Sequence, residues 1–293
     1  MRDTQGVAKF APPTPRSRRL GRELRRLREE RGLTLEQAGK AINMTGARIS
    51  RVELGDIKIS AGGVIELLQA YDVDLQTDQA IAMVATARAM RSEVGWWQRL
   101  GSLTPRFSTY LAYENEATDL LNFEFSLVPG ILQTEAYARA VIGAAPHSDE
   151  AAVDERVKAR IKRQEALRRS KGRLRVHAVV SEAALLVEVG GRTVVREQLE
   201  QLAELSALPN VRIQVLRFAA GASMADNGGF AILRFAEDPP LGHIDTLAGP
   251  LFLEDPGDID RLTAVFDNLR TLALSPPESV DFIKERSRAT QVD

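Results

Sequence analysis

Two arginines, Arg48 and Arg51, stand three positions apart in a short basic stretch, and their type and spacing suit the recognition of a polar surface. Residues three apart on a helix are neighbours, so both guanidinium groups would project from one side. A guanidinium can donate two hydrogen bonds at once to O6 and N7 of a guanine in the major groove of DNA. The alternative is an arginine that is solvated or that only positions a phosphate group.

The surface around these two arginines supplies further candidates for contact with nucleic acid. Thr45, Ala47 and Ser50 would share the outward side of the same helix. Thr34 and Gln37, at the start of the preceding helix, would meet phosphates together with the N–H groups there, because helix N-termini attract anions. Basic residues elsewhere in the stretch are candidates for phosphate contacts: Arg18, Arg19, Arg22 and Lys58.

Three helices must position this surface, and each has a sequence signal. In residues 18–32, apolar side chains recur at the spacing of one helix face: Leu20, Leu24 and Leu27. Gly32 ends that pattern. Thr34, with Gln37 three residues later, predicts a capping box that starts a second, short helix. Thr45 can cap a third helix over residues 46–54, which would carry the two arginines.

The connection between the second and third helices has the spacing of a helix-turn-helix motif. Small Gly39 lets two helices approach closely, and Asn43 can take the left-handed conformation that a tight turn needs. Ile49 and Val52 would then face the core. The run LTLEQAGKAINMTGARISRVELG resembles the lambda-repressor-like (XRE) family of DNA-binding domains. It departs from that family at Asn43, where glycine is usual, and at Leu35, where a phosphate-binding glutamine is common.

Two more helices would complete a five-helix domain. Val64, Leu67, Leu68 and Tyr71 have helical spacing. A longer helix over residues 77–97 would bury the apolar side chains of Ile81, Val84, Ala85 and Val94. These patterns predict a flexible basic arm over residues 1–16, a DNA-binding domain over 17–98, a linker over 99–106 and a second domain over 107–287.

Charge is distributed unevenly along the chain. Residues 1–60 hold 14 Lys and Arg against 7 Asp and Glu, although the whole chain has a net charge of −1. The remainder therefore carries a net charge of −8. This asymmetry favours a DNA-binding head on an acidic body, because only the head would attract phosphates.

Composition excludes several classes of function. The chain has no cysteine and only three histidines, so thiolate zinc sites, disulfides and cysteine nucleophiles are ruled out. There is no phosphate-binding glycine-rich motif, and no cofactor is expected. The absence of a long apolar run and of a signal peptide predicts a cytoplasmic protein without a membrane partner. We expect a protein that is not an enzyme.

The second half of the sequence predicts an α+β domain, so the fold class is mainly α with a mixed α+β second domain. Helices are expected at about 107–119, 134–142, 150–170, 193–206, 257–273 and 277–287. An extended piece near 123–127 and four strands are expected, the strands in RVHAVV, VRIQVLRF, GFAILRF and LGHIDTL.

The segments VPGILQTEAYARAVI, RIKRQEAL, VVSEAALL and GGRTVVREQLEQL resemble the C-terminal domain of WhiJ-like regulators of actinobacteria. The resemblance covers about residues 105–283. It implies a transcriptional regulator, commonly a repressor, that is paired with a small protein encoded by an adjacent gene. The arrangement is similar to that of an antitoxin and its toxin.

The leading hypothesis is therefore a sequence-specific regulator that binds a double-stranded DNA operator. A single small head touches few bases, so a homodimer on two half-sites is expected. The alternatives are an antitoxin-like protein that autoregulates its operon, and a regulator that responds to a small molecule.

Two features of the second half remain open at this stage. His243 and Asp245 would share one face of a strand, with Glu254 and Asp255 as further possible metal ligands, but solvated or structural roles are favoured over metal binding or catalysis. Residues 153–173 carry nine Lys and Arg against three acids. A solvated helix face is favoured there over contact with DNA or an acidic partner.

Overall fold

The structure, a computed structural model, describes residues 13–92, 95–145, 149–170, 172–221, 228–246 and 249–290. The chain divides into two compact units, one of residues 1–99 with 104–113 and one of residues 100–103 with 114–293. Each unit is described by itself. In the described ranges, no helix is both long enough and apolar enough to cross a membrane. Most of the expected basic arm, residues 1–12, lies outside the described residues.

The first unit contains the five helices that the sequence predicts: α1 (Pro15–Glu30), α2 (Leu35–Ala41), α3 (Gly46–Glu53), α4 (Ala61–Ala70) and α5 (Asp78–Ser92). Helix α1 begins two residues before the expected start at Ser17. The reason is a capping box, in which the side chain of Thr14 accepts a hydrogen bond from the Ser17 N–H and the Ser17 hydroxyl oxygen accepts one from the Thr14 N–H. Pro15 suits the first helical position because its missing N–H is not needed there.

The apolar core of these helices confirms most of the predicted stripes. Leu24, Ile49, Val64, Leu67 and Leu68 are fully buried. The stripe predicted for the fifth helix was wrong at Ile81 and Ala85, whereas Val84 does pack against the core. The structure buries Ala80, Met83, Ala87 and Met90, whereas Ile81 is 53% exposed and Ala85 is also exposed. Both sets have helical spacing, so periodicity alone could not separate them. Val94 lies outside the described residues.

A buried ion pair joins α1 to the end of α3. Nε and Nη2 of Arg28 donate to the two carboxylate oxygens of Glu53, at 2.6 and 2.9 Å. Nη1 of Arg28 donates to the carbonyl oxygen of Leu33 at 2.7 Å, in the loop before α2. The pairing with Glu53 raises the pKa of Arg28, so the guanidinium stays charged. One side chain therefore ties three segments of the helix-turn-helix region together.

The part of the chain after residue 95 contains six strands and the remaining helices. The helical segments are η1 (Trp96–Arg99), α6 (Pro105–Glu116), η2 (Gly130–Leu132), α7 (Glu135–Gly143), α8 (Glu150–Arg163), α9 (Glu165–Arg168), η3 (Glu182–Leu185), α10 (Arg192–Leu205), η4 (Phe218–Ala220), α11 (Pro256–Leu272) and α12 (Pro276–Ala289). The strands are β1 (Asp119–Glu124), β2 (Arg175–Ser181), β3 (Val211–Leu216), β4 (Phe230–Arg234), β5 (Leu241–Thr246) and β6 (Gly249–Leu253).

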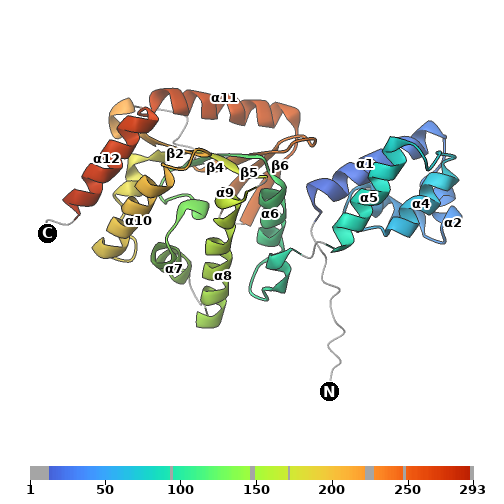
Figure 1. Cartoon of the computed structure of the whole chain (residues 1–293), viewed down its shortest axis with the longest axis horizontal. Coiled ribbons are helices and arrows are strands. Elements are labelled where there is room, and N and C mark those ends of the chain that lie inside the picture. The colour runs from blue at the N-terminus through green and yellow to red at the C-terminus, as the bar shows by residue number, and fades with distance from the viewer. Residues whose placement is uncertain are drawn as a thin grey trace, which may run out of the picture. The chain divides into compact units, whose positions relative to one another are not determined.

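The strands form one mixed sheet in the order β3-β2-β1-β4-β5-β6. Strands β1, β2 and β3 are parallel, and β4, β5 and β6 each run antiparallel to their neighbours. In the second unit, α11 lies along one face of the sheet, while α7, α8 and α10 lie on the other face (Figure 1). Under α11, Phe123, Val179, Phe266 and Leu269 form a buried apolar cluster. An N-terminal helical domain followed by a mixed α/β domain is the fold class that the sequence predicts.

The structure differs from the expected elements in a few places. Strand β6 was not predicted, because GPLFL begins with two residues that weaken strands. The helix expected over 150–170 is divided into α8 and α9 at Gln164. The extended piece expected near 123–127 is strand β1, which ends at Glu124. Helix α6 begins at Pro105, inside the expected linker.

Breaking the Arg28–Glu53 pair should destabilise the first unit strongly. In Glu53→Ala, the Arg28 guanidinium stays buried without its partner, which we expect to lower the free energy of unfolding by about 3 kcal/mol. Urea unfolding followed by tryptophan fluorescence would measure this, since Trp96 and Trp97 both belong to the first unit. Glu30→Ala is the matched control, because the Arg26–Glu30 pair is exposed and its loss should cost under about 1 kcal/mol. Equal effects of the two substitutions would contradict this role of the buried pair.

Candidate nucleic-acid interface

The turn between α2 and α3 depends on two residues with little steric freedom. Asn43 has a φ of 54°, the left-handed conformation that the sequence predicts. The N–H of Met44 donates to the carbonyl oxygen of Gly39 at 2.8 Å. A Cβ atom at Gly39 would lie 2.4 Å from the carbonyl oxygen of Met44, so only glycine fits. This close approach fixes the angle at which α3 leaves the turn.

Two threonines cap the helices of the motif, as predicted. Thr34 Oγ1 accepts from the Gln37 N–H at 3.2 Å, and Gln37 Oε1 accepts from the Thr34 N–H at 2.8 Å. Thr45 Oγ1 accepts from the Arg48 N–H at 3.2 Å. These bonds use acceptor atoms only. The hydroxyl hydrogens and the Gln37 amide group therefore remain able to donate to a phosphate.

The two sides of α3 differ in burial. Ile49 and Val52 are buried against the core, with 0% and 3% of their surface exposed. Thr45, Ala47 and Arg48 are exposed. Arg48 makes no side-chain hydrogen bond or ion pair with the part of the chain that the structure describes. Its guanidinium is thus available for an external partner.

The other predicted contact residues are less accessible. Ser50 and Arg51 are partly buried on α3, and Arg51 already takes part in a polar interaction within the chain. Lys58 is exposed, but its Nζ donates to the carbonyl oxygen of Met90 at 2.9 Å, near the end of α5. That bond satisfies one helix-end carbonyl and leaves two of the three ammonium donors.

The three arginines predicted on α1 lie in different environments. Arg22 is exposed, whereas Arg18 and Arg19 are partly buried. Arg18 packs against Gly55, where a Cβ atom would lie 2.8 Å from the Arg18 backbone nitrogen. Thr34, Gln37 and the exposed residues of α3 therefore all belong to the helix-turn-helix motif of α2 and α3. The basic residues Arg18, Arg19 and Arg22 lie on another helix, α1.

His243 and Asp245 of the second unit do share one face of β5, as predicted. Their Nε2 and Oδ1 atoms are 3.6 Å apart. Burial lowers the pKa of His243, so its imidazole is neutral near pH 7. Asp255 instead caps α11, accepting from the Gly257 N–H at 2.9 Å. The described residues contain no group of three or more residues suited to a metal ion.

The interpretation of residues 153–173 as a solvated basic face was wrong for two of its arginines. Arg163 is buried and donates two hydrogen bonds to Glu114 of α6, and the Nε atom of Arg160 is buried as well. A sequence signal existed. Val153 and Val157 are buried on α8, and continuing their spacing places residue 160 on the same inward face.

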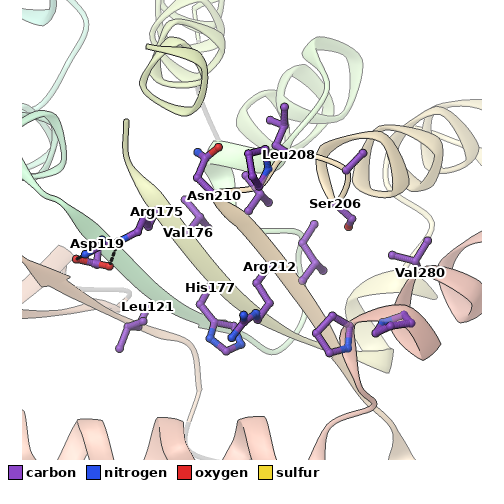
Figure 2. Close-up of a pocket in the computed structure, with 16 residues that line it drawn as sticks. Asp119, Leu121, Arg175, Val176, His177, Ser206, Leu208, Asn210, Arg212 and Val280 are labelled. Atoms are coloured by element: carbon purple, nitrogen blue, oxygen red, sulfur yellow. Dashed lines mark hydrogen bonds and ion pairs between the residues drawn. The ribbon is translucent and has the colours of Figure 1, made fainter. Parts of the chain in front are cut away.

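A pocket of about 610 Å³ lies at the edge of the sheet formed by β2 and β3 (Figure 2). Arg175 and Asp119 are ion-paired there at 2.6 Å, and His177 lies beside Arg212 on the neighbouring strand. Burial lowers the pKa of His177, whose Nε2 lies 2.7 Å from Oε1 of Gln214. Of the charged groups that line this pocket, Asp119 and Arg175 compensate each other.

Gly39→Ala should disrupt the interface without touching any exposed side chain. The added methyl group would lie 2.4 Å from a backbone oxygen, so the turn must move, and we expect a loss of about 1–3 kcal/mol of stability. Gly62→Ala on α4 is the control, since its new Cβ would meet nothing closer than 3.8 Å. Urea unfolding followed by tryptophan fluorescence would compare them. A stable Gly39→Ala variant would show that the close turn is not required.

Two family models match the chain. A helix-turn-helix domain matches residues 19–80, which confirms the motif that the sequence predicts and supports a DNA-binding regulator. A domain of unknown function, DUF5753, matches residues 107–285. Comparison with curated proteins gives no match, and comparison with solved structures gives none. Because the DUF5753 match covers more than half of the length of the chain, the chain belongs to the family of proteins that carry this domain.

Proposed function

We propose that this protein is a sequence-specific transcriptional regulator, acting as a repressor, whose helix α3 enters the major groove of operator DNA. The observation that carries the proposal is the asymmetry of α3. On its inner side, Ile49 and Val52 are buried in the core and Glu53 forms the ion pair with Arg28. On its outer side, Arg48 is exposed and its side chain has no partner among the described residues. An exposed guanidinium on a helix whose inner side is fixed suits bidentate recognition of guanine.

Phosphate contacts would set the position of α3 on the duplex. Thr34 and Gln37 lie at the N-terminus of α2, where unpaired N–H groups favour an anion. Lys58, Arg18, Arg19 and Arg22 add positive charge to this basic head. Such contacts supply affinity and orientation but no sequence information. Base recognition rests on Arg48 and Arg51, with Thr45, Ala47 and Ser50 beside them.

We also propose a homodimer and a partner for the second unit. One helix-turn-helix head covers few base pairs, and two heads on an inverted repeat would supply the missing specificity. The resemblance of the second half to WhiJ-like regulators supports a small protein encoded by an adjacent gene as the partner. Co-expression of both proteins followed by affinity purification tests this. Failure of the small protein to co-purify would contradict the partnership.

Removing either arginine of α3 should weaken binding in a sequence-dependent way. With a duplex selected from a random pool, Arg48→Ala and Arg51→Ala should each lose about 1–3 kcal/mol and tolerate substitutions at one base pair. Lys58→Ala should weaken all sequences alike and reduce the salt slope by about 1. Arg88→Ala, an exposed arginine of α5, is the control. Fluorescence anisotropy at several salt concentrations measures these effects. Equal losses on selected and unrelated duplexes would contradict base recognition by α3.

The homodimer predicts a specific mass and a specific binding site. Sedimentation equilibrium should give about twice the chain mass of 32.2 kDa, and the selected duplex should contain an inverted repeat with half-sites about one helical turn apart. A stable monomer that binds operator-length DNA with nanomolar affinity and without cooperativity would exclude this arrangement.

A further inference from the structure

A group of charged and polar side chains lies inside the second unit, at the carboxyl end of β1. Asn122 and Glu124 of β1 alternate with Phe123, which faces α11, so they point to the opposite face of the sheet. Helix α8 supplies Arg160 and Arg163 to the same place. The group is completed by Glu114 of α6, Gln133 after η2 and His243 of β5.

One pair within this group is fully compensated. Arg163 donates from Nε and Nη2 to the two oxygens of Glu114, at 2.7 and 2.6 Å. Both side chains are buried, with 6% and 4% of their surface exposed. This side-on geometry is the strongest arrangement of a guanidinium with a carboxylate. The neighbouring Arg160 has no such arrangement with a carboxylate of the described residues.

Arg160, one helical turn earlier, forms no ion pair with a carboxylate of the described residues. Its Nη1 donates to Oε1 of Gln133 at 2.9 Å, but its Nε is buried and has no hydrogen-bond acceptor among those residues. Burial, together with the nearby charge of Arg163, lowers the pKa of Arg160 to about 10. The side chain keeps some accessible surface. Arg160 is therefore a largely buried cation, and no anion in the part of the chain that the structure describes pairs with the Nε side of its guanidinium.

Glu124 is the complementary case. Its Oε1 receives one long hydrogen bond, of 3.4 Å, from Nδ2 of Asn122, and it forms no ion pair with the described residues. Burial raises the pKa of Glu124 to about 7. A Cβ atom at Gly229 would lie 2.8 Å from Glu124 Oε2, so glycine there leaves room for the carboxylate. Glu124 is partly accessible, and Arg160 and Arg163 act on it through space without forming an ion pair with it in the described part of the chain.

A buried cation and a buried carboxylate that stay apart are costly, because each loses hydration without gaining a partner. We propose that Arg160 and Glu124 are the two ends of a binding site for a small zwitterion, an amino acid or a close relative, whose carboxylate meets Arg160 and whose ammonium group meets Glu124. Such a ligand compensates both charges at once. The neutral imidazole of His243 and the amide of Asn122 lie beside them and can add hydrogen bonds.

The topology of the sheet supports the same location. The chain passes from β1 to β2 and β3 on one side, then returns to β4 on the other side of β1. Strand order thus reverses at β1, and ligands of open α/β sheets bind outside the carboxyl ends of strands at such a point. Glu124 is the last residue of β1. The site goes beyond the proposed regulator and does not depend on DNA binding.

The first experiment measures the melting temperature of the full chain by calorimetry with each standard amino acid in turn. Acetate and ethylammonium, which each carry one of the two charges, are added separately at matched ionic strength. At ten times its dissociation constant, a bound amino acid should raise the melting temperature by about 4 °C, and neither single-charge probe should match it. No shift with any amino acid would overturn the proposal, as would an equal shift with acetate.

Variants connect that shift to the site. Arg160→Gln should reduce amino-acid affinity at least tenfold, and Arg160→Lys, which keeps the charge but not the planar fork, should reduce it less. Arg168→Gln is the control, because Arg168 is exposed on α9. Since each variant is compared with itself without ligand, a lower basal stability does not obscure the result. Unchanged affinity in Arg160→Gln would contradict the assignment.

The pH dependence gives an independent prediction. The groups that face Glu124 are Asn122 on its own strand, Arg160 and Arg163 from α8, Asp245 from β5 and Tyr137 from α7. An ammonium group requires the ionised carboxylate, so affinity should rise about tenfold from pH 6 to pH 8 as Glu124 loses its proton. Burial lowers the pKa of His243, which moves its titration toward lower pH than that of a free imidazole. Titration calorimetry of Glu124→Gln should show weaker, pH-independent binding, and an unchanged profile would contradict the role of Glu124.

Discussion

The buried ion pair between Arg28 and Glu53 is the interaction on which the helix-turn-helix unit depends most. Helix α3 has only eight residues, too few to be stable by itself. Its orientation comes from Glu53 at its last residue, from Ile49 and Val52 on its inner side, and from the glycine turn before it. A buried pair adds little net stability compared with apolar packing, but it tolerates a single arrangement of its partners. Orientation is what a recognition helix needs.

The second unit contains one buried arginine that is paired with a carboxylate and a second one that forms no ion pair with the described residues. Arg163 and Glu114 are closed on each other, and they hold α8 against α6 as Arg28 and Glu53 hold α1 against α3. Arg160 and Glu124 lie nearby with opposite charges and remain apart. Burying an unpaired charge costs free energy, so a bound ligand that supplies the opposite charge stabilises the fold. The orientation of α3 and the proposed ligand site therefore both depend on buried arginines, one of them paired and the other not.

Most of the fold was predictable because local signals were strong. Capping threonines, the left-handed Asn43 and the i, i+4 stripes identified the first three helices with small differences in their ends, and the apolar spacing identified the fourth. Part of the buried stripe of α5 was predicted wrongly, since alanine and methionine compete weakly with isoleucine in a hydrophobic pattern. The ion pairs of the buried Arg28 and Arg163 were missed for a different reason. Their partners, Glu53 and Glu114, are 25 and 49 residues away, and no local spacing reveals such pairs.

The central claim is that the outer side of α3 contacts base edges in the major groove. Methylation interference tests it directly, because a methyl group on guanine N7 blocks an arginine there without changing any phosphate. The account predicts that N7 methylation prevents binding at guanines in two half-sites about one helical turn apart. If binding tolerates N7 methylation everywhere and is prevented only by ethylation of phosphates, α3 does not contact the bases and the account is wrong.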